Sequence, residues 1–302
     1  LVDVCAKVDD KFLEENSLTK GDEHLVDMEV FMFIHDKLKK PEVKFGGSVA
    51  NTLAGLNIMG CKVGEFAKVG KDGYGQMLID EKNIKNMGNF LSQDNLPTGA
   101  VICLITPDAE RTFVVYLGAA QKLSSDDISE EIIKQTKYLH ITAYEFESVH
   151  DAVIKAVKIA KKNNVKVSFD LGSPGLVERN KLSLKKFIKE YVDIVFANKD
   201  EAFHLTGENP MKALDKISEM AEIAIVKIGS EGSMIKTEEK VYEIPAFQVD
   251  TVDTTGAGDM YAAGILYGLV KKIDLSQAGR IASHNAAKVC ETIGARLENM
   301  EL

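Results

Sequence analysis

The sequence predicts an α/β fold: a doubly wound, mostly parallel sheet with helices on both faces. The first observation behind this is a regular alternation of strand-like and helix-like segments from Gly118 onward. Strands that alternate with helices at this spacing favour parallel pairing. The second observation is a hairpin signal, Pro107-Asp108-Ala109-Glu110, between β-rich runs at 98–106 and 111–117. The hairpin interrupts the alternation in the first part of the chain.

Composition narrows the class of protein. The chain has 302 residues, of which 45% are hydrophobic and 27% charged, and a net charge of −9. This suits a globular protein of one large or two medium domains. The acidic balance argues against a nucleic-acid partner. No apolar run is long enough to cross a bilayer, and residues 1–8 do not resemble a signal peptide. We therefore expect a cytoplasmic enzyme, without a membrane partner, whose four scattered cysteines are buried free thiols.

Elements of the first part follow from local signals. Gly46-Gly47 makes a turn, after which Ser48 caps a helix that Gly60 ends. Residues 17–45 are otherwise short alternating segments. The elements expected before Gly118 are a strand at 1–8, helices near 29–38, 48–59 and 74–87, a strand at 63–69, and the two runs of the hairpin.

In the second part, each helix follows a strand. The segment 149–163 has apolar residues at Val153, Val157 and Ala160, which is helical spacing. A loop with Gly172, Pro174 and Gly175 follows the strand at 165–170. The expected strands are 138–143, 165–170, 192–197, 222–228, the run after the turn at 229–232, and 241–247. The expected helices are 149–163, one near 182–191, one opening at 198–201, one at 256–270 and the last at about 276–292.

The strongest chemical signal is the stretch 253–259, Asp-Thr-Thr-Gly-Ala-Gly-Asp, which runs into an apolar helix. Gly256 and Gly258 let the backbone turn sharply and approach a ligand closely. The first N–H groups of a helix lack intrahelical partners and lie at the positive end of its dipole, so they can bind phosphate. Asp259 is placed to take a proton from a hydroxyl group there. The alternative is a plain helix cap.

Two other phosphate-binding motifs are absent. There is no G-x-x-x-x-G-K-[ST] loop, and Tyr261 takes the third glycine's place in a dinucleotide fingerprint. We therefore expect the turn before the helix to hold phosphate without a lysine of the phosphate-loop type.

The stretch 253–259 resembles the C-terminal signature of the ribokinase (PfkB) family of sugar and nucleoside kinases. Gly46-Gly47-Ser48-Val49-Ala50-Asn51 is similar to a second signature of that family. The resemblance covers essentially the whole chain. It implies one ribokinase-like kinase domain at 1–302, with a small β-sheet lid formed from about 8–45 and 98–118. The segment 140–174 looks closer to adenosine kinases than to sugar kinases.

The resemblance also implies roles for individual residues. Asp259 would be the base, and the backbone of Gly256, Ala257 and Gly258 the anion site. The acceptor would be held by Asp3, Gly46, Gly47 and Asn51, with Arg111 reaching the phosphates from the lid. Asp3 could instead be a solvent-facing strand residue, and Arg111 a surface arginine.

ATP and metal sites are implied in the same way. The ATP-binding residues would be Asn198, Lys227, Gly229, Gly232 and Asn285. Glu201 would organise Mg²⁺ through water, and Asp253 and Thr255, with residues 294–296, would bind a monovalent cation such as K⁺. Asn198 could equally be a helix cap, and 229–232 a tight hairpin.

These inferences favour an ATP-dependent kinase that phosphorylates the primary alcohol of a ribose-containing substrate, adenosine first. The alternatives are a sugar kinase of the ribose or fructose type, and a sugar- or nucleoside-binding protein without catalysis. We expect a monomer or homodimer. In the family a Gly-Asn pair precedes the first strand, so a few N-terminal residues are expected to be missing here.

Overall fold

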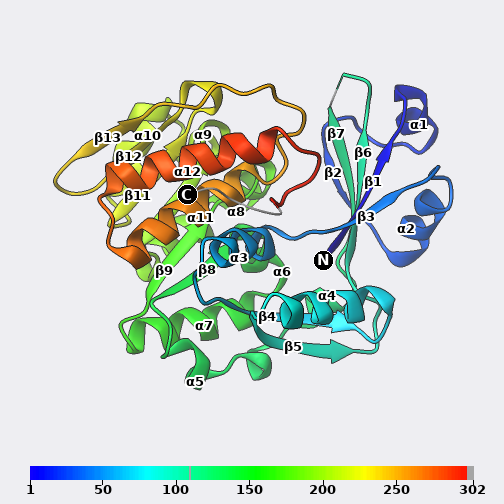
Figure 1. Ribbon diagram of the computed structural model, residues 1–302, viewed down its shortest axis with the longest axis horizontal. Coiled ribbons are helices and arrows are strands. Elements are labelled where there is room, and N and C mark those ends of the chain that lie inside the picture. Colours follow the sequence, from blue (N-terminus) through cyan, green and yellow to red (C-terminus); the bar gives the residue numbers. More distant parts are fainter. Residues whose placement is uncertain (109, 298–302) are drawn as a thin grey trace. The chain divides into compact units, whose positions relative to one another are not determined.

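The computed structural model describes residues 1–108 and 110–297. Contacts divide the chain into two compact units, which we treat separately (Figure 1). The first unit contains residues 1–51 and 62–123, and the second contains 52–61 and the chain from 124 onward. Helix α3 (Ser48–Ile58) contributes its first turn to the first unit and its remainder to the second.

The first unit is built on a five-stranded sheet in the order β2-β7-β6-β1-β3 (Figure 1). β6 and β7 form the antiparallel hairpin that the sequence predicts, and β1 pairs with β6 in parallel. β4 and β5 form a separate parallel pair. The strands are β1 (Val2–Lys7), β2 (Glu23–Leu25), β3 (Glu42–Phe45), β4 (Gly64–Gly70), β5 (Gly88–Asp94), β6 (Ala100–Ile105) and β7 (Arg111–Tyr116). In addition to α3, the helices of this unit are α1 (Asp10–Glu15), α2 (Met28–His35), α4 (Gly73–Ile84) and the 3-10 helix η1 (Gly118–Lys122).

The core of this unit uses one face of the five-stranded sheet. Val2 and Val4 of β1 are fully buried and pack in one cluster with Leu13 of α1 and Phe31 of α2. Because successive side chains of a strand point to opposite faces, Asp3 lies on the other face, away from that cluster. Short helices therefore pack on one side of the sheet, and Asp3 lies on the other.

The second unit is built on a six-stranded sheet in the order β13-β12-β11-β10-β9-β8. β8 to β11 are all parallel, while β12 and β13 are antiparallel additions at one edge. The strands are β8 (Tyr138–Thr142), β9 (Lys166–Asp170), β10 (Ile194–Asn198), β11 (Ile223–Lys227), β12 (Ser233–Lys236) and β13 (Val241–Ile244).

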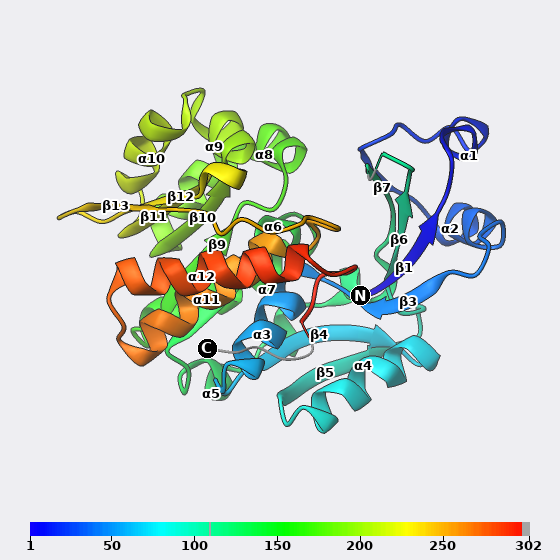
Figure 2. The same cartoon turned by 45° about the horizontal axis from the view of Figure 1, so that its top comes forward.

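Helices cover both faces of this sheet. Figure 2 shows α8, α9 and α10 on one face, and α11 and α12 on the other. The helices are α5 (Glu130–Ile133), α6 (Ala143–Ser148), α7 (His150–Lys162), α8 (Pro174–Tyr191), α9 (Lys199–Thr206), α10 (Pro210–Ser218), α11 (Ala257–Lys271) and α12 (Leu275–Cys290), with 3-10 turns η2 (Ser125–Asp127) and η3 (Gly229–Glu231). α11 is apolar around most of its surface and is buried, as its sequence predicts.

The predicted mostly parallel sheet flanked by helices is thus confirmed. Helix α8, however, begins at Pro174 and not near 182, because Ser173 caps it and the proline occupies its first turn. The prediction of one domain with a lid at 8–45 and 98–118 stays a prediction, and residues 298–302 lie outside the described part. The four cysteines are free; Cys61 and Cys103 are buried, whereas Cys5 and Cys290 are partly exposed.

None of the helices in the described part of the chain combines the length and apolar character needed to span a membrane.

Candidate active site

The glycine turn at 253–259 forms the start of α11. Gly256 is the residue before the helix and has φ 79°, the left-handed region that glycine tolerates. A Cβ on Gly256 would lie 2.5 Å from the carbonyl oxygen of Ala295, so the site also lacks space for a side chain. The N–H of Gly258 has no hydrogen-bond partner in the part of the chain that the structure describes. This is the arrangement expected of an anion site at a helix N-terminus.

Asp253 holds this turn in place. Its carboxylate accepts hydrogen bonds from the N–H of Thr255 at 2.7 Å and from the N–H of Gly294 at 2.8 Å. The side chain is buried, and it joins the turn to the segment after α12. The binding of a monovalent cation by Asp253 and Thr255 stays a prediction.

Three parallel strands end beside one another with polar residues. Asp170 is the last residue of β9, Asn198 of β10 and Lys227 of β11. Asn198 pairs in register with Lys227, and Asp170 pairs with Phe196. Ligands of open parallel sheets gather at the carboxyl ends of strands, so this row lies where a site is expected.

Lys227 lies against the glycine turn at the start of α11. Its Nζ lies 3.1 Å from the position that a Cβ on Gly258 would take, and 3.1 Å from Oδ2 of Asp170. Burial alone would lower the pKa of Lys227, but Asp170, Glu201 and Asp259 outweigh it and raise the pKa above its ordinary value. The turn therefore does have a lysine, supplied by a strand and not by a phosphate loop.

Asn198 and Glu201 form a capping box at the start of α9. The side-chain oxygen of Asn198 accepts from the N–H of Asp200 and of Glu201, and the Glu201 carboxylate accepts from the N–H and side-chain amide of Asn198. Burial, followed by the nearby Asp170 carboxylate, raises the pKa of Glu201 to about 7. The cap that the sequence left as an alternative for Asn198 is present, and the ATP and Mg²⁺ roles of the pair stay predictions.

The remaining predicted ATP residues lie in two places. Gly229 and Gly232 bound the turn between β11 and β12, where both have positive φ and the Gly232 N–H donates to the Gly229 carbonyl. Asn285 is buried in α12, and its amide donates to Sδ of Met59 at 3.3 Å. Contact of these residues with nucleotide stays a prediction.

No group of three or more His, Cys, Asp or Glu side chains arranged to hold a metal ion occurs among the described residues. A Mg²⁺ ion that keeps several waters and binds phosphate oxygens needs only one or two protein carboxylates. The buried Glu201 carboxylate, in the first turn of the helix that follows β10, is the oxygen donor predicted for such an ion.

The predicted acceptor residues of the first unit are brought together at the start of β1. A Cβ on Gly46 would lie 2.0 Å from Oδ1 of Asp3, so the Asp3 carboxylate occupies the space that glycine leaves. The Asn51 N–H donates to the Gly47 carbonyl at 2.8 Å, in the first turn of α3. Gly47 has φ 91°, which explains the second glycine of this turn. These four residues therefore form one local cluster.

Arg111 lies farther away within the same sheet. It pairs with Ile105, and Ile105 pairs with Lys7, four residues along β1 from Asp3. Four residues of strand correspond to about 13 Å. Arg111 and Asp3 share a face of the sheet. The proposed approach of Arg111 to phosphate stays a prediction.

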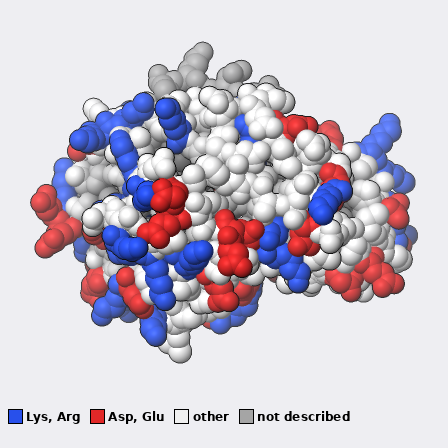
Figure 3. Space-filling view, turned by 90° about the horizontal axis from the view of Figure 1, so that it is seen from below, with Lys and Arg blue, Asp and Glu red and all other residues white. Residues whose placement is uncertain are grey.

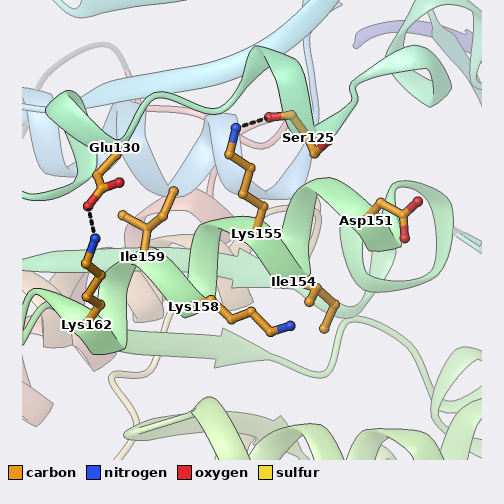
Figure 4. Close-up of a pocket in the computed structure, with 8 residues that line it drawn as sticks. All are labelled: Ser125, Glu130, Asp151, Ile154, Lys155, Lys158, Ile159 and Lys162. Atoms are coloured by element: carbon orange, nitrogen blue, oxygen red, sulfur yellow. Dashed lines mark hydrogen bonds and ion pairs between the residues drawn. The ribbon is translucent and has the colours of Figure 1, made fainter.

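A pocket of about 490 Å³ lies on the second unit, between η2, α5 and α7. As Figure 4 shows, Lys155 donates to the Ser125 carbonyl and Lys162 pairs with Glu130. None of the predicted site residues lines it. On the molecular face in Figure 3, basic and acidic side chains are intermingled.

His140 lies in β8, beside the row of strand ends. Its Nδ1 is 3.0 Å from Oγ of Ser168, and its Nε2 is buried without a partner in the described residues. Burial lowers its pKa to about 4, and Lys227 acts in the same direction, although Asp170 opposes the shift. The native state therefore favours the neutral ring.

This gives a stability prediction. Below pH 6.5 the unfolded chain binds a proton at His140 that the folded chain rejects until about pH 4, so the free energy of unfolding falls as the pH falls through this range. Between pH 6.5 and 5 the loss should reach up to about 2 kcal/mol. In urea unfolding, His140→Asn should remove this part of the acid sensitivity. An unchanged pH dependence in the variant would contradict the assignment.

Comparison with known proteins shows the family of this chain. Residues 29–301 match the model of the pfkB family carbohydrate kinases. A protein named uncharacterized sugar kinase from Archaeoglobus fulgidus is 30% identical over 80% of this chain and 96% of its own length. A 5-dehydro-2-deoxygluconokinase from Clostridium botulinum is 30% identical over 80% of this chain and 77% of its own. The chain belongs to the PfkB family and is a kinase.

A solved structure is also similar. The adenosine kinase from Sinorhizobium meliloti superimposes with a TM-score of 0.93 and 29% identity, covering 99% of this chain and 93% of that one. The ribokinase-like fold predicted from the sequence is thereby confirmed. The relatives include kinases of sugars and of nucleosides, so the substrate is a matter for proposal.

Proposed function

We propose that this kinase transfers the γ-phosphoryl group of ATP to the primary alcohol of a ribose-containing substrate, with adenosine as the favoured acceptor. The observation that carries the proposal is the start of α11. There an open glycine turn, the Lys227 ammonium and the Asp259 carboxylate belong to one site. Such a site combines the anion binding and the base that phosphoryl transfer to an alcohol requires.

Each group has a task in this reaction. Charge in the transition state spreads over the transferred phosphoryl oxygens, so positioning and electrostatic stabilisation do most of the work. The N–H groups of Gly256, Ala257 and Gly258, with Lys227, would stabilise that charge. Asp259, in the first turn, would accept the proton of the acceptor hydroxyl. Mg²⁺, held near Glu201, would supply further positive charge to the ATP phosphates.

The acceptor would bind at the cluster of Asp3, Gly46, Gly47 and Asn51. A carboxylate and an amide suit neighbouring hydroxyl groups of a sugar, which both donate and accept hydrogen bonds. The likeness to the Sinorhizobium meliloti adenosine kinase supports adenosine. The likeness to a 5-dehydro-2-deoxygluconokinase supports a free sugar as the second candidate.

The test is a coupled assay of ADP release over a panel of nucleosides and free sugars. Adenosine should give the highest kcat/KM. A free sugar with a higher kcat/KM than every nucleoside would show that the acceptor is a free sugar, the second candidate. If no acceptor makes ADP release faster than it is without an acceptor, the proposed phosphotransfer is contradicted.

A variant of Asp3 tests the acceptor site. A site that hydrogen-bonds hydroxyls rejects analogues without them by a large factor, because its own polar groups are left unpaired. A 2′,3′-dideoxy nucleoside should therefore be a very poor substrate of the wild type. Asp3→Ala should lose much of this discrimination, since the two changes remove the same interaction. Steady-state kcat/KM for both acceptors measures the effect, and full discrimination in the variant would place the ribose elsewhere.

A further inference from the structure

Asp170 is a buried carboxylate that the sequence did not single out. It ends β9, and its Oδ2 lies 3.1 Å from Nζ of Lys227, which ends β11 two strands away. Both side chains are largely enclosed, 8% exposed for Asp170 and 14% for Lys227. Screening by solvent is therefore weak, and the pair is electrostatically stronger than a surface ion pair.

Asp170 is itself held firmly. Its Oδ1 accepts a hydrogen bond of 3.0 Å from the N–H of Gly172. Gly172 has φ 76°, and its carbonyl accepts from the hydroxyl of Tyr144. One carboxylate oxygen is thus bound to a fixed turn, and the other is directed at the lysine.

The ion pair determines where the ammonium lies. A lysine side chain has four rotatable bonds, so burial at a strand end does not by itself fix Nζ. Here Nζ lies between Asp170 and the first turn of α11, 3.1 Å from the position of a Cβ on Gly258. A displacement of about 1 Å in a catalytic group can cost about 10²-fold in rate.

We propose that Asp170 is a positioning residue, which holds the Lys227 ammonium against the Gly258 turn so that it meets the phosphoryl group of ATP. The inference rests on the proposed function, since it assigns Lys227 to the ATP phosphates. Asp170 would act only through Lys227 and would not contact the acceptor.

A double-mutant cycle tests this, with the wild type, Asp170→Asn, Lys227→Met and the double variant. Affinity for ATP is measured by calorimetry, and kcat and KM by ADP release. Asp170→Asn should lower kcat about 10- to 100-fold and weaken ATP binding, while KM for the acceptor changes little. In the Lys227→Met background the same change should have almost no further effect, because the group that it positions is gone.

Asp193→Asn is the matched control. Asp193 is a buried carboxylate of the same unit, which pairs with Lys161 and Lys166 and accepts from the N–H of Val167. Its loss should lower the melting temperature while kcat and ATP affinity remain near wild type. Lys227→Met leaves the negative charge of Asp170 buried without a positive partner, which can unfold the protein. The double variant carries neither charge, so it can still be compared with Asp170→Asn if the Lys227→Met protein unfolds.

The outcomes separate the inference from the proposed function. If Asp170→Asn costs as much in the Lys227→Met background as it does in the wild type, or leaves kcat and ATP affinity unchanged, Asp170 does not act through the lysine. If the wild type binds ATP but phosphorylates no acceptor, the proposed function fails. The ATP affinities of the four proteins in the cycle then still test whether Asp170 acts through Lys227. If the wild type does not bind ATP, both fail.

Discussion

Replacement of Asp259 by asparagine should lower kcat by about 10²- to 10⁴-fold, the range typical of a lost general base. Asparagine keeps the shape of the side chain in the first turn of α11 but cannot take the proton of the acceptor hydroxyl. Binding of ATP uses other groups, so its affinity should change little. Stopped or coupled assays of ADP release, together with calorimetry of ATP binding, measure the two effects separately.

Asp274→Asn provides the control for this variant. Asp274 precedes α12 and accepts a hydrogen bond from the N–H of Ser276, so it is also a carboxylate at a helix start. Its replacement should leave kcat close to that of the wild type. Near-normal turnover in Asp259→Asn would mean that the base is another group.

The second large effect is expected for Gly258→Val. A side chain at this position would meet the Lys227 ammonium, 3.1 Å away, where the phosphoryl group is proposed to bind. Loss of one preorganised donor costs about 10²- to 10³-fold in kcat. Gly258 does not have the positive φ of Gly256, so the backbone can accept valine and the protein should fold. Circular dichroism and ADP release test these expectations.

Gly73→Val isolates the effect of valine in the first turn of a helix. Gly73 opens α4, and a Cβ there would have no neighbour within 4 Å. This variant should be folded and active. A folded Gly258→Val protein with normal activity would remove the phosphate-binding turn from the account.

Much of the second unit could be predicted because its signals are local. Buried parallel strands are short apolar runs, and helix periodicity is clear between them. The predicted start of α8 is too late, since Gly172, Pro174 and Gly175 indicate a loop, although Ser173 and Pro174 are also start signals. Leu182, where the predicted helix begins, is 84% exposed and lies mid-helix. Helix α10 was not predicted, despite its cap at Asn209. In the first unit, strand β5 was not predicted because it is mostly polar and none of its residues is fully buried.

The parts of the candidate site that come from one continuous stretch of chain could be predicted from the sequence. The glycine turn and Asp259 are contiguous, and Gly46 to Asn51 form one turn and helix start. The pair of Asp170 and Lys227 had no such signal, since 57 residues separate them and only the pairing of β9, β10 and β11 joins them. The role of Gly46 was equally hidden, because its lack of a side chain matters only where Asp3 lies against it.

Phosphoryl transfer from ATP to a primary alcohol is proposed to take place at the start of α11. The most direct measurement is ³¹P NMR of the reaction of the wild type with ATP and adenosine, beside a reaction with 5′-deoxyadenosine. We expect a new phosphomonoester on the 5′ oxygen of adenosine, formed together with ADP, and no new ester with the 5′-deoxy analogue. Formation of inorganic phosphate alone, or of equal amounts of ester with both compounds, would contradict it.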